Sequence, residues 1–345
     1  TLFGKITDLG YQLPPLHDRV DLVGMGSALE PHYKGFSEKL LKKAIQRLRQ
    51  DRDPGLLTVW FATCRYRPMS AFRDEAVTYQ GEPILPLPAV VFDERGHLPK
   101  EQRLAELVRA SRACGRKTLV FVEQTGTRDI RSRLVETLGR LVPGVNVQML
   151  SAADMKPAKR ELWIKRHAPA LDVLLVNAGL VKTGLDLVMF NDLVFYETNT
   201  SLYTVWQSMR RVWRLGQQRH VTTTFLAYRG AMEAQLLDLM GEKMKAAMLL
   251  YGDDAAGALV DTDTDEDLAR ELIRRALDGK TIGTAGDING QALFGDKPAG
   301  GEVLVEVSQA EPLPVSDWPM PKPAAPAEAV GQLSLFGGLV AVEVK

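Results

Sequence analysis

Cysteine is almost absent from this sequence, which holds only Cys64 and Cys114 among 345 residues. Neither stands in a CxxC or CxxH pattern, so a disulfide scaffold and a cysteine zinc site are both excluded. Long apolar runs are also missing: the stretch 171–175 is far too short to cross a bilayer, and we expect no membrane partner. The five histidines have no metal-ligand spacing, so we expect no metal site in this chain.

An excess of one charge is missing as well, because 43 Lys and Arg balance 43 Asp and Glu. A zero net charge does not exclude a nucleic-acid partner, since a local basic stripe is sufficient. The phosphate loop G-x-x-x-x-G-K-[ST] does not occur; the run 179–183 comes near it, but Val181 stands where the glycine before the lysine belongs. The run 93–97 imitates an Asp-Glu-x-His magnesium motif with one residue too many, and we interpret it as a loop turn.

What the sequence does contain is an alternation of short apolar strands with amphipathic helices. This pattern predicts an α/β fold, a parallel sheet with helices on both faces, in which ligands bind at the carboxyl ends of the strands. Residues 52–95 look mixed, with many Pro and Gly breaks, and residues 253–271 look like an acidic, solvated connection. The expected strands are 118–123, 145–150, 173–177, 193–196 and 221–228, and the expected helices are 27–50, 100–114, 127–141, 157–167, 202–215 and 232–251.

The predicted helix 202–215 is the segment that points most directly to chemistry. Gln207, Arg211 and Arg214 fall at i, i+4 and i+7, so one face of the helix presents an amide and two guanidinium groups. Guanidinium groups form planar, permanently charged forks that suit phosphate. A solvated basic face is the other interpretation of the same pattern. Gly216 is expected to end the helix, and the apolar face would consist of Leu202, Val205, Met209 and Val212.

Four segments can be compared with known sequence motifs: Gln207, Arg211, Arg214, Leu215, Gly216 and Gln217; Gly184-Leu185-Asp186-Leu187; the strand 117–124; and Leu13-Pro14-Pro15 followed by Val20, Met25 and Tyr33. They occur in the order typical of the C-terminal motor lobe of superfamily-two helicases, and this chain resembles most closely the Swi/Snf-type DNA translocases. Two departures concern Arg210, where the family often has Asp, and residues 198–201, where it has Asn-Pro.

The resemblance implies a RecA-like lobe that works on ATP together with a second lobe. Arg214 would be the arginine finger that reaches the γ-phosphate, and Arg211 would be the second arginine on the phosphate side. Mg²⁺ and most of the ATP would be held by an N-terminal RecA-like lobe, which we expect upstream of Thr1, so this chain alone is predicted to be inactive. Gln207, Gly184 and Asp186 are predicted to lie at the nucleotide, and Thr183, Gln124 and Thr125 at the backbone of duplex DNA.

The resemblance and the composition together predict four regions. Residues 1–98 would be an inter-lobe helical segment and residues 99–252 the RecA-like lobe. Residues 253–309 would be an acidic or mixed extension, and residues 310–345 a Pro-rich linker with a tail.

The tail contains Gln332-Leu333-Ser334-Leu335-Phe336, which resembles the peptide by which bacterial replication and repair proteins dock on the sliding clamp. Gln332 would fill a polar pocket, and Leu333, Leu335 and Phe336 would supply apolar anchors. A terminal strand packed on the lobe is the alternative. Clamp docking would place the protein in the bacterial cytoplasm. A second function stays open on these grounds, namely a non-catalytic adaptor that carries nucleic acid to the clamp.

Overall fold

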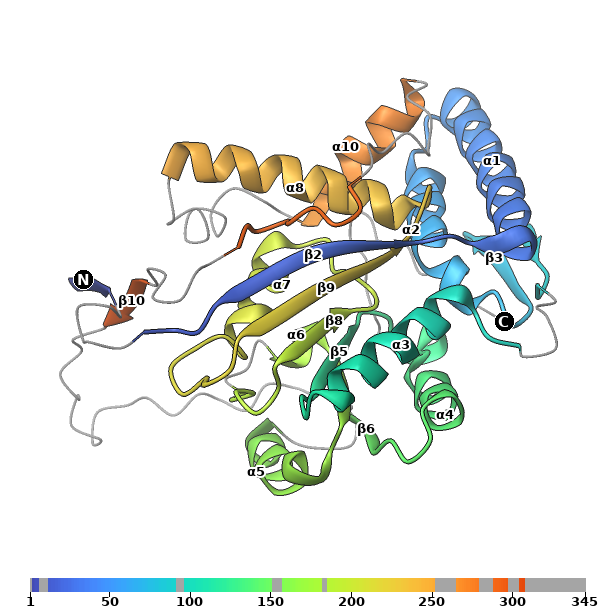
Figure 1. The fold of residues 1–345 in the computed structure, drawn as a ribbon. Coiled ribbons are helices and arrows are strands. Elements are labelled where there is room, and N and C mark those ends of the chain that lie inside the picture. Colours follow the sequence, from blue (N-terminus) through green and yellow to red (C-terminus); the bar gives the residue numbers. More distant parts are fainter. Residues whose placement is uncertain are drawn as a thin grey trace, which may run out of the picture.

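A six-stranded parallel sheet forms the centre of the molecule (Figure 1). The computed structural model describes residues 2–5, 12–90, 96–150, 157–181, 185–251, 265–278, 288–296 and 304–307. The strand order is β2-β9-β8-β5-β7-β6, and every neighbouring pair is parallel. The strands are β2 (Leu16–Val23), β5 (Thr118–Val122), β6 (Val147–Leu150), β7 (Val173–Asn177), β8 (Asp192–Phe195) and β9 (Val221–Tyr228).

Helices cover both faces of this sheet, with α8 above it and α3 and α4 below it in Figure 1. The expected α/β class with a RecA-like parallel sheet is therefore confirmed. The helices of this layer are α3 (Pro99–Ala113), α4 (Arg131–Leu141), α5 (Pro157–His167), α6 (Ala178–Val181), α7 (Leu202–Arg210) and α8 (Met232–Tyr251), with 3-10 turns η2 (Gly126–Arg128) and η3 (Ala168–Ala170).

The register of the sheet stacks three phenylalanines in one row. Phe121 on β5 lies opposite Phe195 on β8, which lies opposite Phe225 on β9. Their ring centroids are 4.5 and 4.9 Å apart. Phe294 continues the row at 6.0 Å from Phe225 and stacks on Trp206 of α7 at 5.4 Å. The aromatic row therefore links the middle of the sheet to α7, the helix that precedes the predicted Arg211 and Arg214.

The segment before residue 99 contributes a strand to the sheet and a helical pair beside it. β2 pairs with β9 along its whole length, from Leu16 opposite Val221 to Val23 opposite Tyr228. α1 (Gly26–Asp51) then packs on α2 (Gly55–Ser70) near the carboxyl ends of the strands (Figure 1). The sheet contains β2 from before residue 98 and five strands from after it. The expected domain boundary at residue 98 stays a prediction.

Three expectations about secondary structure were wrong. Residues 52–90 were expected to lack a clear pattern of secondary structure, but they form α2 and the hairpin of β3 (Glu75–Tyr79) and β4 (Glu82–Leu87). Pro54 stands at the N-cap of α2 and Pro68 in its last turn, so neither breaks the helix. Residues 265–277 are not solvated connection but helix α10 (Asp265–Leu277), with Leu268 and Leu272 buried against α8 and α2.

The third error concerns α4, which begins at Arg131 rather than at residue 127 because η2 comes first. The remaining strands, β1 (Leu2–Lys5) and β10 (Leu304–Val307), pair antiparallel with each other away from the main sheet. The far edge of β2 is also covered: Val20 donates its N–H to Gln291 O at 2.9 Å and accepts from Gly290 N at 2.7 Å. The segment 288–296 of the C-terminal extension therefore lies along the edge of the sheet.

Candidate nucleotide and nucleic-acid site

Helix α7 is shorter than predicted, so Arg211 and Arg214 lie in the turns that follow it rather than on the helix. Ser201 caps it, accepting the N–H of Thr204 at 3.2 Å. Leu202, Val205, Met209 and Val212 are buried, so the apolar face is confirmed. The helix ends at Arg210, five residues before the predicted end.

Contacts from a distant segment explain the early end of α7. Leu187 donates its N–H to Arg211 O at 3.2 Å, and the Gln217 side chain donates to Val212 O at 3.2 Å. These donors take carbonyls that a longer helix would use for its own hydrogen bonds. Gly216, at φ +97°, lies in the turn after this point rather than at the helix end.

Gln217 is a structural residue whose role the sequence reasoning missed. It is buried, and its amide nitrogen also donates to Val188 O and Phe190 O, each at 3.0 Å. Its amide oxygen accepts from Asn191 Nδ2 and from Arg219 N, each at 3.1 Å. The side chain therefore fastens the arginine segment to residues 188–191. The only available signal was its place at the end of the resemblance motif.

The hydrogen bond from Leu187 to Arg211 thus joins residues 185–187 to the arginine segment. Leu185 and Leu187 are buried, whereas Asp186 is half-buried and its Oδ1 has no hydrogen-bond partner among the described residues. Thr183 and Gly184 lie outside the described residues.

Positive charge is concentrated where α7 ends. Gln207 and Arg211 are half-buried and Arg214 is exposed. Burial lowers the pKa of Arg210, and the charges of Arg211 and Arg214 lower it further. The charges of Arg211 and Arg214 thus both act on Arg210, so positive charge gathers at the end of α7, where a phosphate could bind.

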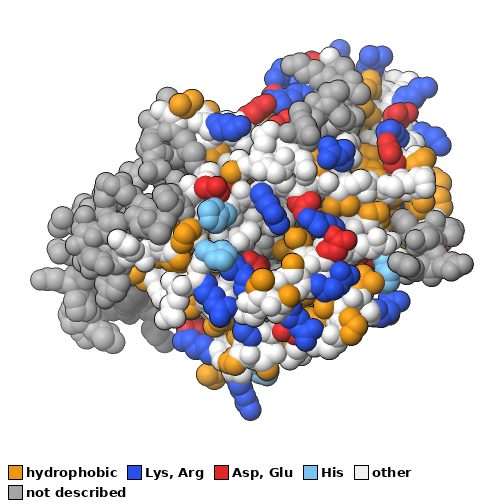
Figure 2. All heavy atoms as spheres, viewed as in Figure 1, with side chains coloured by type: hydrophobic (Ala, Val, Ile, Leu, Met, Phe, Trp, Pro, Cys, Tyr) orange, Lys and Arg blue, Asp and Glu red, His pale blue; other side chains and the backbone are white. Residues whose placement is uncertain are grey.

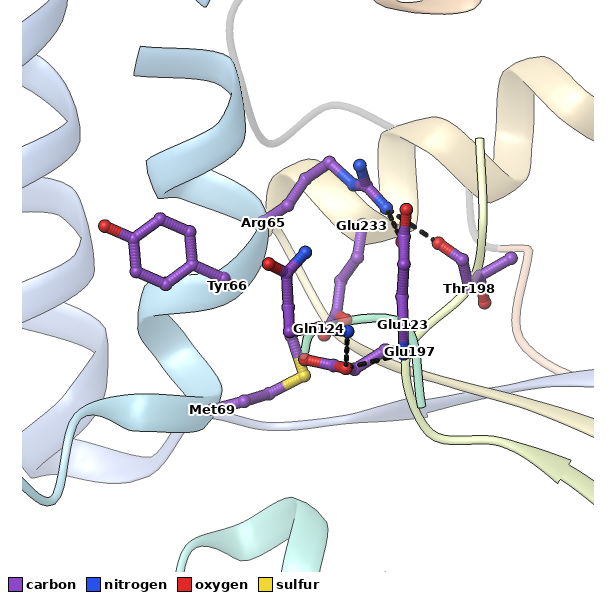
Figure 3. A pocket seen from close by; sticks show the side chains of 8 residues that line it. All are labelled: Arg65, Tyr66, Met69, Glu123, Gln124, Glu197, Thr198 and Glu233. Atoms are coloured by element: carbon purple, nitrogen blue, oxygen red, sulfur yellow. Dashed lines mark hydrogen bonds and ion pairs between the residues drawn. The ribbon is translucent and has the colours of Figure 1, made fainter. Parts of the chain in front are cut away.

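The carboxyl ends of β5 and β8 form a second predicted part of the site. Glu197, directly after β8, accepts the N–H of Glu123 at 2.8 Å and that of Gln124 at 2.9 Å (Figure 3). Asn177, the last residue of β7, donates to Glu123 O at 2.6 Å. Gln124 is half-buried and Thr125 exposed, so the edge of the sheet presents both predicted nucleic-acid contacts on a fixed backbone.

Helix α2 covers this edge with Arg65. Its guanidinium forms an ion pair with Glu123 and donates to Thr198 O at 2.8 Å (Figure 3). One side chain thus joins α2 to the loops after both β5 and β8. Sequence reasoning missed this contact because it placed no helix over residues 55–70.

Buried charges lie beneath that contact. Burial and the charge of Glu123 raise the pKa of Glu197 to about 7, against the opposing effect of its two backbone hydrogen bonds. Lys100 is fully buried and pairs with Glu233 at 2.7 Å between Nζ and Oε2. Burial lowers the pKa of Lys100, and Glu233 opposes that shift.

The remaining predicted residues are not placed by the structure. Gln332, Leu333, Leu335 and Phe336 lie outside the described residues, as do residues 93–95 of the magnesium-like run. Among the described residues, no group of three or more His, Cys, Asp or Glu side chains is arranged to hold a metal ion.

The sequence of the lobe matches a known family over the region just described. The model of the helicase conserved C-terminal domain matches residues 99–216. These residues are therefore a helicase conserved C-terminal domain, and the predicted resemblance to Swi/Snf-type helicases is confirmed.

Two curated relatives show the extent of the similarity. The TATA-binding protein-associated factor mot1 of Aspergillus fumigatus is 28% identical over 161 residues, which is 46% of this chain and 8% of that protein. The helicase-like transcription factor CHR27 of Arabidopsis thaliana is 26% identical over 155 residues, 44% of this chain and 14% of that protein. The chain therefore spans only a small part of these relatives. They come from a fungus and a plant, so they do not support the expected bacterial origin.

A solved structure has the same fold. The C-terminal part of the Fun30 ATPase domain superposes with a TM-score of 0.51 at 13% identity, covering 77% of this chain and 99% of that one. At this identity the likeness shows the fold alone.

None of the helices that the structure describes is long and apolar enough to span a membrane.

Proposed function

We propose that this chain is the C-terminal lobe of an ATP-dependent DNA helicase or translocase and supplies the arginine finger. The observation that carries the proposal is that Leu187 and the Gln217 side chain donate to Arg211 O and Val212 O and so hold the segment of Arg210, Arg211 and Arg214 beside residues 185–190. The helicase C-terminal domain and the helicase-like relative support the same conclusion.

In this proposal each polar group has a stated task. ATP, bound between this lobe and a first lobe, supplies the phosphoryl group. The exposed Arg214 guanidinium reaches the γ-phosphate and neutralises charge that develops in the transition state. Arg211 adds a second positive charge, and Gln207 and Asp186 orient the segment around the nucleotide. Gln124, Thr125 and Thr183 bind the DNA backbone without reading its sequence.

The proposal includes a division of labour between two lobes. This sequence has no phosphate loop, and its described residues offer no magnesium ligand cluster. We therefore assign both to the first lobe and route no Mg²⁺ step through this chain. Residues 1–345 alone should not hydrolyse ATP, with or without duplex DNA. Robust DNA-stimulated turnover by this chain alone would contradict the proposal.

The decisive experiment uses a protein that joins this chain to an ATP-binding first lobe. Arg214→Ala should lower DNA-stimulated turnover by about a thousandfold or more while leaving ATP binding intact. Arg140→Ala removes an exposed arginine on α4 and is the matched control, expected to keep full turnover. Equal activity of the Arg214 variant and the control would favour the adaptor function instead.

Clamp docking is a separate proposal and depends on residues 332–336 alone. A peptide of residues 328–340 should bind a bacterial sliding clamp and lose binding on Phe336→Ala. Cytoplasmic localisation in a bacterium depends on the same result. No binding at high micromolar peptide would exclude this docking mode.

A further inference from the structure

Helix α1 has an exposed basic stripe, which we define as Lys39, Lys42, Lys43 and Arg49. These residues recur at helical spacing, and all four are exposed. The helix is held by another face, on which Leu29, Tyr33, Phe36, Leu40 and Ala44 are buried. The stripe is therefore not needed to seat the helix.

The charge of the stripe is not balanced within the helix. Residues 39–50 contain five Lys and Arg and no Asp or Glu; Glu38 and Asp51 flank them. No ion pair joins a residue of the stripe to a carboxylate in the part of the chain that the structure describes. Figure 2 shows Lys and Arg side chains at the upper right, where α1 ends in Figure 1, with a few acidic side chains among them.

Arg47 shows what a structural cation on the same helix looks like. It is half-buried, lies within 4 Å of Asp51, Asp53 and Glu82, and sits 5.0 Å over the ring of Tyr79. The acidic groups near this end of α1 are thus engaged by Arg47. The stripe lies beside this cluster and faces solvent.

The position and length of the stripe fit a nucleic-acid backbone. α1 packs on α2, and α2 contacts the loops after β5 and β8 through Arg65. α1 is thus joined through α2 to the strand ends that carry Gln124 and Thr125. Lys39 and Arg49 are about 15 Å apart along the axis at 1.5 Å per residue, the rise over which one DNA strand presents about four phosphates.

We propose that the basic stripe of α1 binds the phosphate backbone of duplex DNA. This interaction surface is additional to the proposed DNA contacts of Gln124, Thr125 and Thr183. The choice of duplex DNA as partner rests on the proposed function. ATP hydrolysis does not enter the proposal.

The test is a salt titration of DNA binding by the 345-residue chain. Its affinity for a labelled duplex of about 30 base pairs is measured by fluorescence anisotropy between about 50 and 200 mM KCl, without ATP. The variant K39Q/K42Q/K43Q/R49Q should bind at least about tenfold more weakly. The negative slope of log K against log[salt] should become shallower by about 3.6, which is 0.9 for each of the four lost contacts.

The matched control removes the same charge from helices on the other side of the sheet. The variant R109Q/R140Q/K165Q/R166Q changes four exposed residues of α3, α4 and α5 and should keep the wild-type slope to within about one unit. Thermal melts followed by circular dichroism check that both variants fold.

Three results would overturn the proposal: no duplex binding by the wild-type chain, equal losses in the two variants, or a slope unchanged in the stripe variant. Stripe-dependent binding of poly-glutamate without stripe-dependent binding of duplex would assign the surface to an acidic polypeptide instead. Because ATP is absent, a failure here is distinct from a failure of the Arg214 experiment.

Discussion

Helix α2 and the end of helix α7 use arginine in opposite ways. Arg67 of α2 is fully buried, and its guanidinium donates to the carbonyls of Ser70, Arg73, Leu87 and Pro88 and to His32 Nε2. Arg214, after α7, is exposed, and its charge lowers the pKa of Arg210. A buried arginine whose donors are taken by four carbonyls and an imidazole holds the fold together, whereas the exposed Arg214 is open to a ligand.

The comparison is tested most strongly by removing each arginine in turn. Arg67→Ala should lower the free energy of unfolding by about 3–5 kcal/mol, because Glu75 is left buried, with only Arg73 beside it, and four carbonyls lose a donor. Arg214→Ala should change it by less than about 0.5 kcal/mol. Urea denaturation of the 345-residue chain measures both. Similar losses in the two variants would remove the distinction.

A smaller effect is expected at Glu197, under the contact that Arg65 makes. Its pKa is about 7 in the folded protein against an ordinary value of 4.5, so the unfolded chain loses this proton first as pH rises. The Glu197 contribution to stability should therefore fall between about pH 4.5 and 7, by about 3 kcal/mol in all, and stay level above that range.

Glu197→Gln isolates this contribution, because the amide oxygen still accepts the two backbone N–H groups. The difference in unfolding free energy between wild type and variant should change across that pH range in favour of the variant. Parallel stability profiles of the two proteins from pH 4.5 to 8 would contradict the assignment.

Gln217→Leu should weaken the other region. Three carbonyls and two N–H groups lose a partner, so we expect a loss of about 2 kcal/mol in unfolding free energy. In the two-lobe protein, turnover should fall as well, because residues 211–217 are no longer fixed. Gln218→Leu is the matched control at an exposed neighbouring position and should leave both quantities unchanged.

The smallest expected effect is at the start of α7. Ser201→Ala removes the N-cap and should cost about 1 kcal/mol of unfolding free energy, whereas Ser201→Asp should restore most of it. Thermal melts of the three proteins measure this order. Equal stability of the Ala and Asp variants would mean that the cap does not hold the helix.

The sequence predicted five of the six strands of the sheet and most helices because their apolar residues recur at clear periods, but it did not predict β2. It missed α2 because that helix is buried on almost every side, from Leu56 to Met69, and so has no polar face to set a period. It extended α7 too far because Leu187 and Gln217 bind the carbonyls of Arg211 and Val212, just beyond the end of the helix. Such contacts leave no local signal in the sequence. Arg211 and Arg214 were proposed from their motif, whereas the contact of Arg65 could be found only after α2 was seen.

The pairing of β2 with β9 has a consequence for how the lobe folds during its synthesis. The two strands are more than 200 residues apart in the chain, although they lie side by side in the sheet. During synthesis at about 5–20 residues per second, β2 leaves the ribosome about 10–40 s before its partner exists. Throughout that interval its backbone donors and apolar side chains, including Leu16 and Val20, have no sheet to join. Chaperone binding during translation should therefore concentrate on the first quarter of the chain, long before the arginine segment has been synthesised.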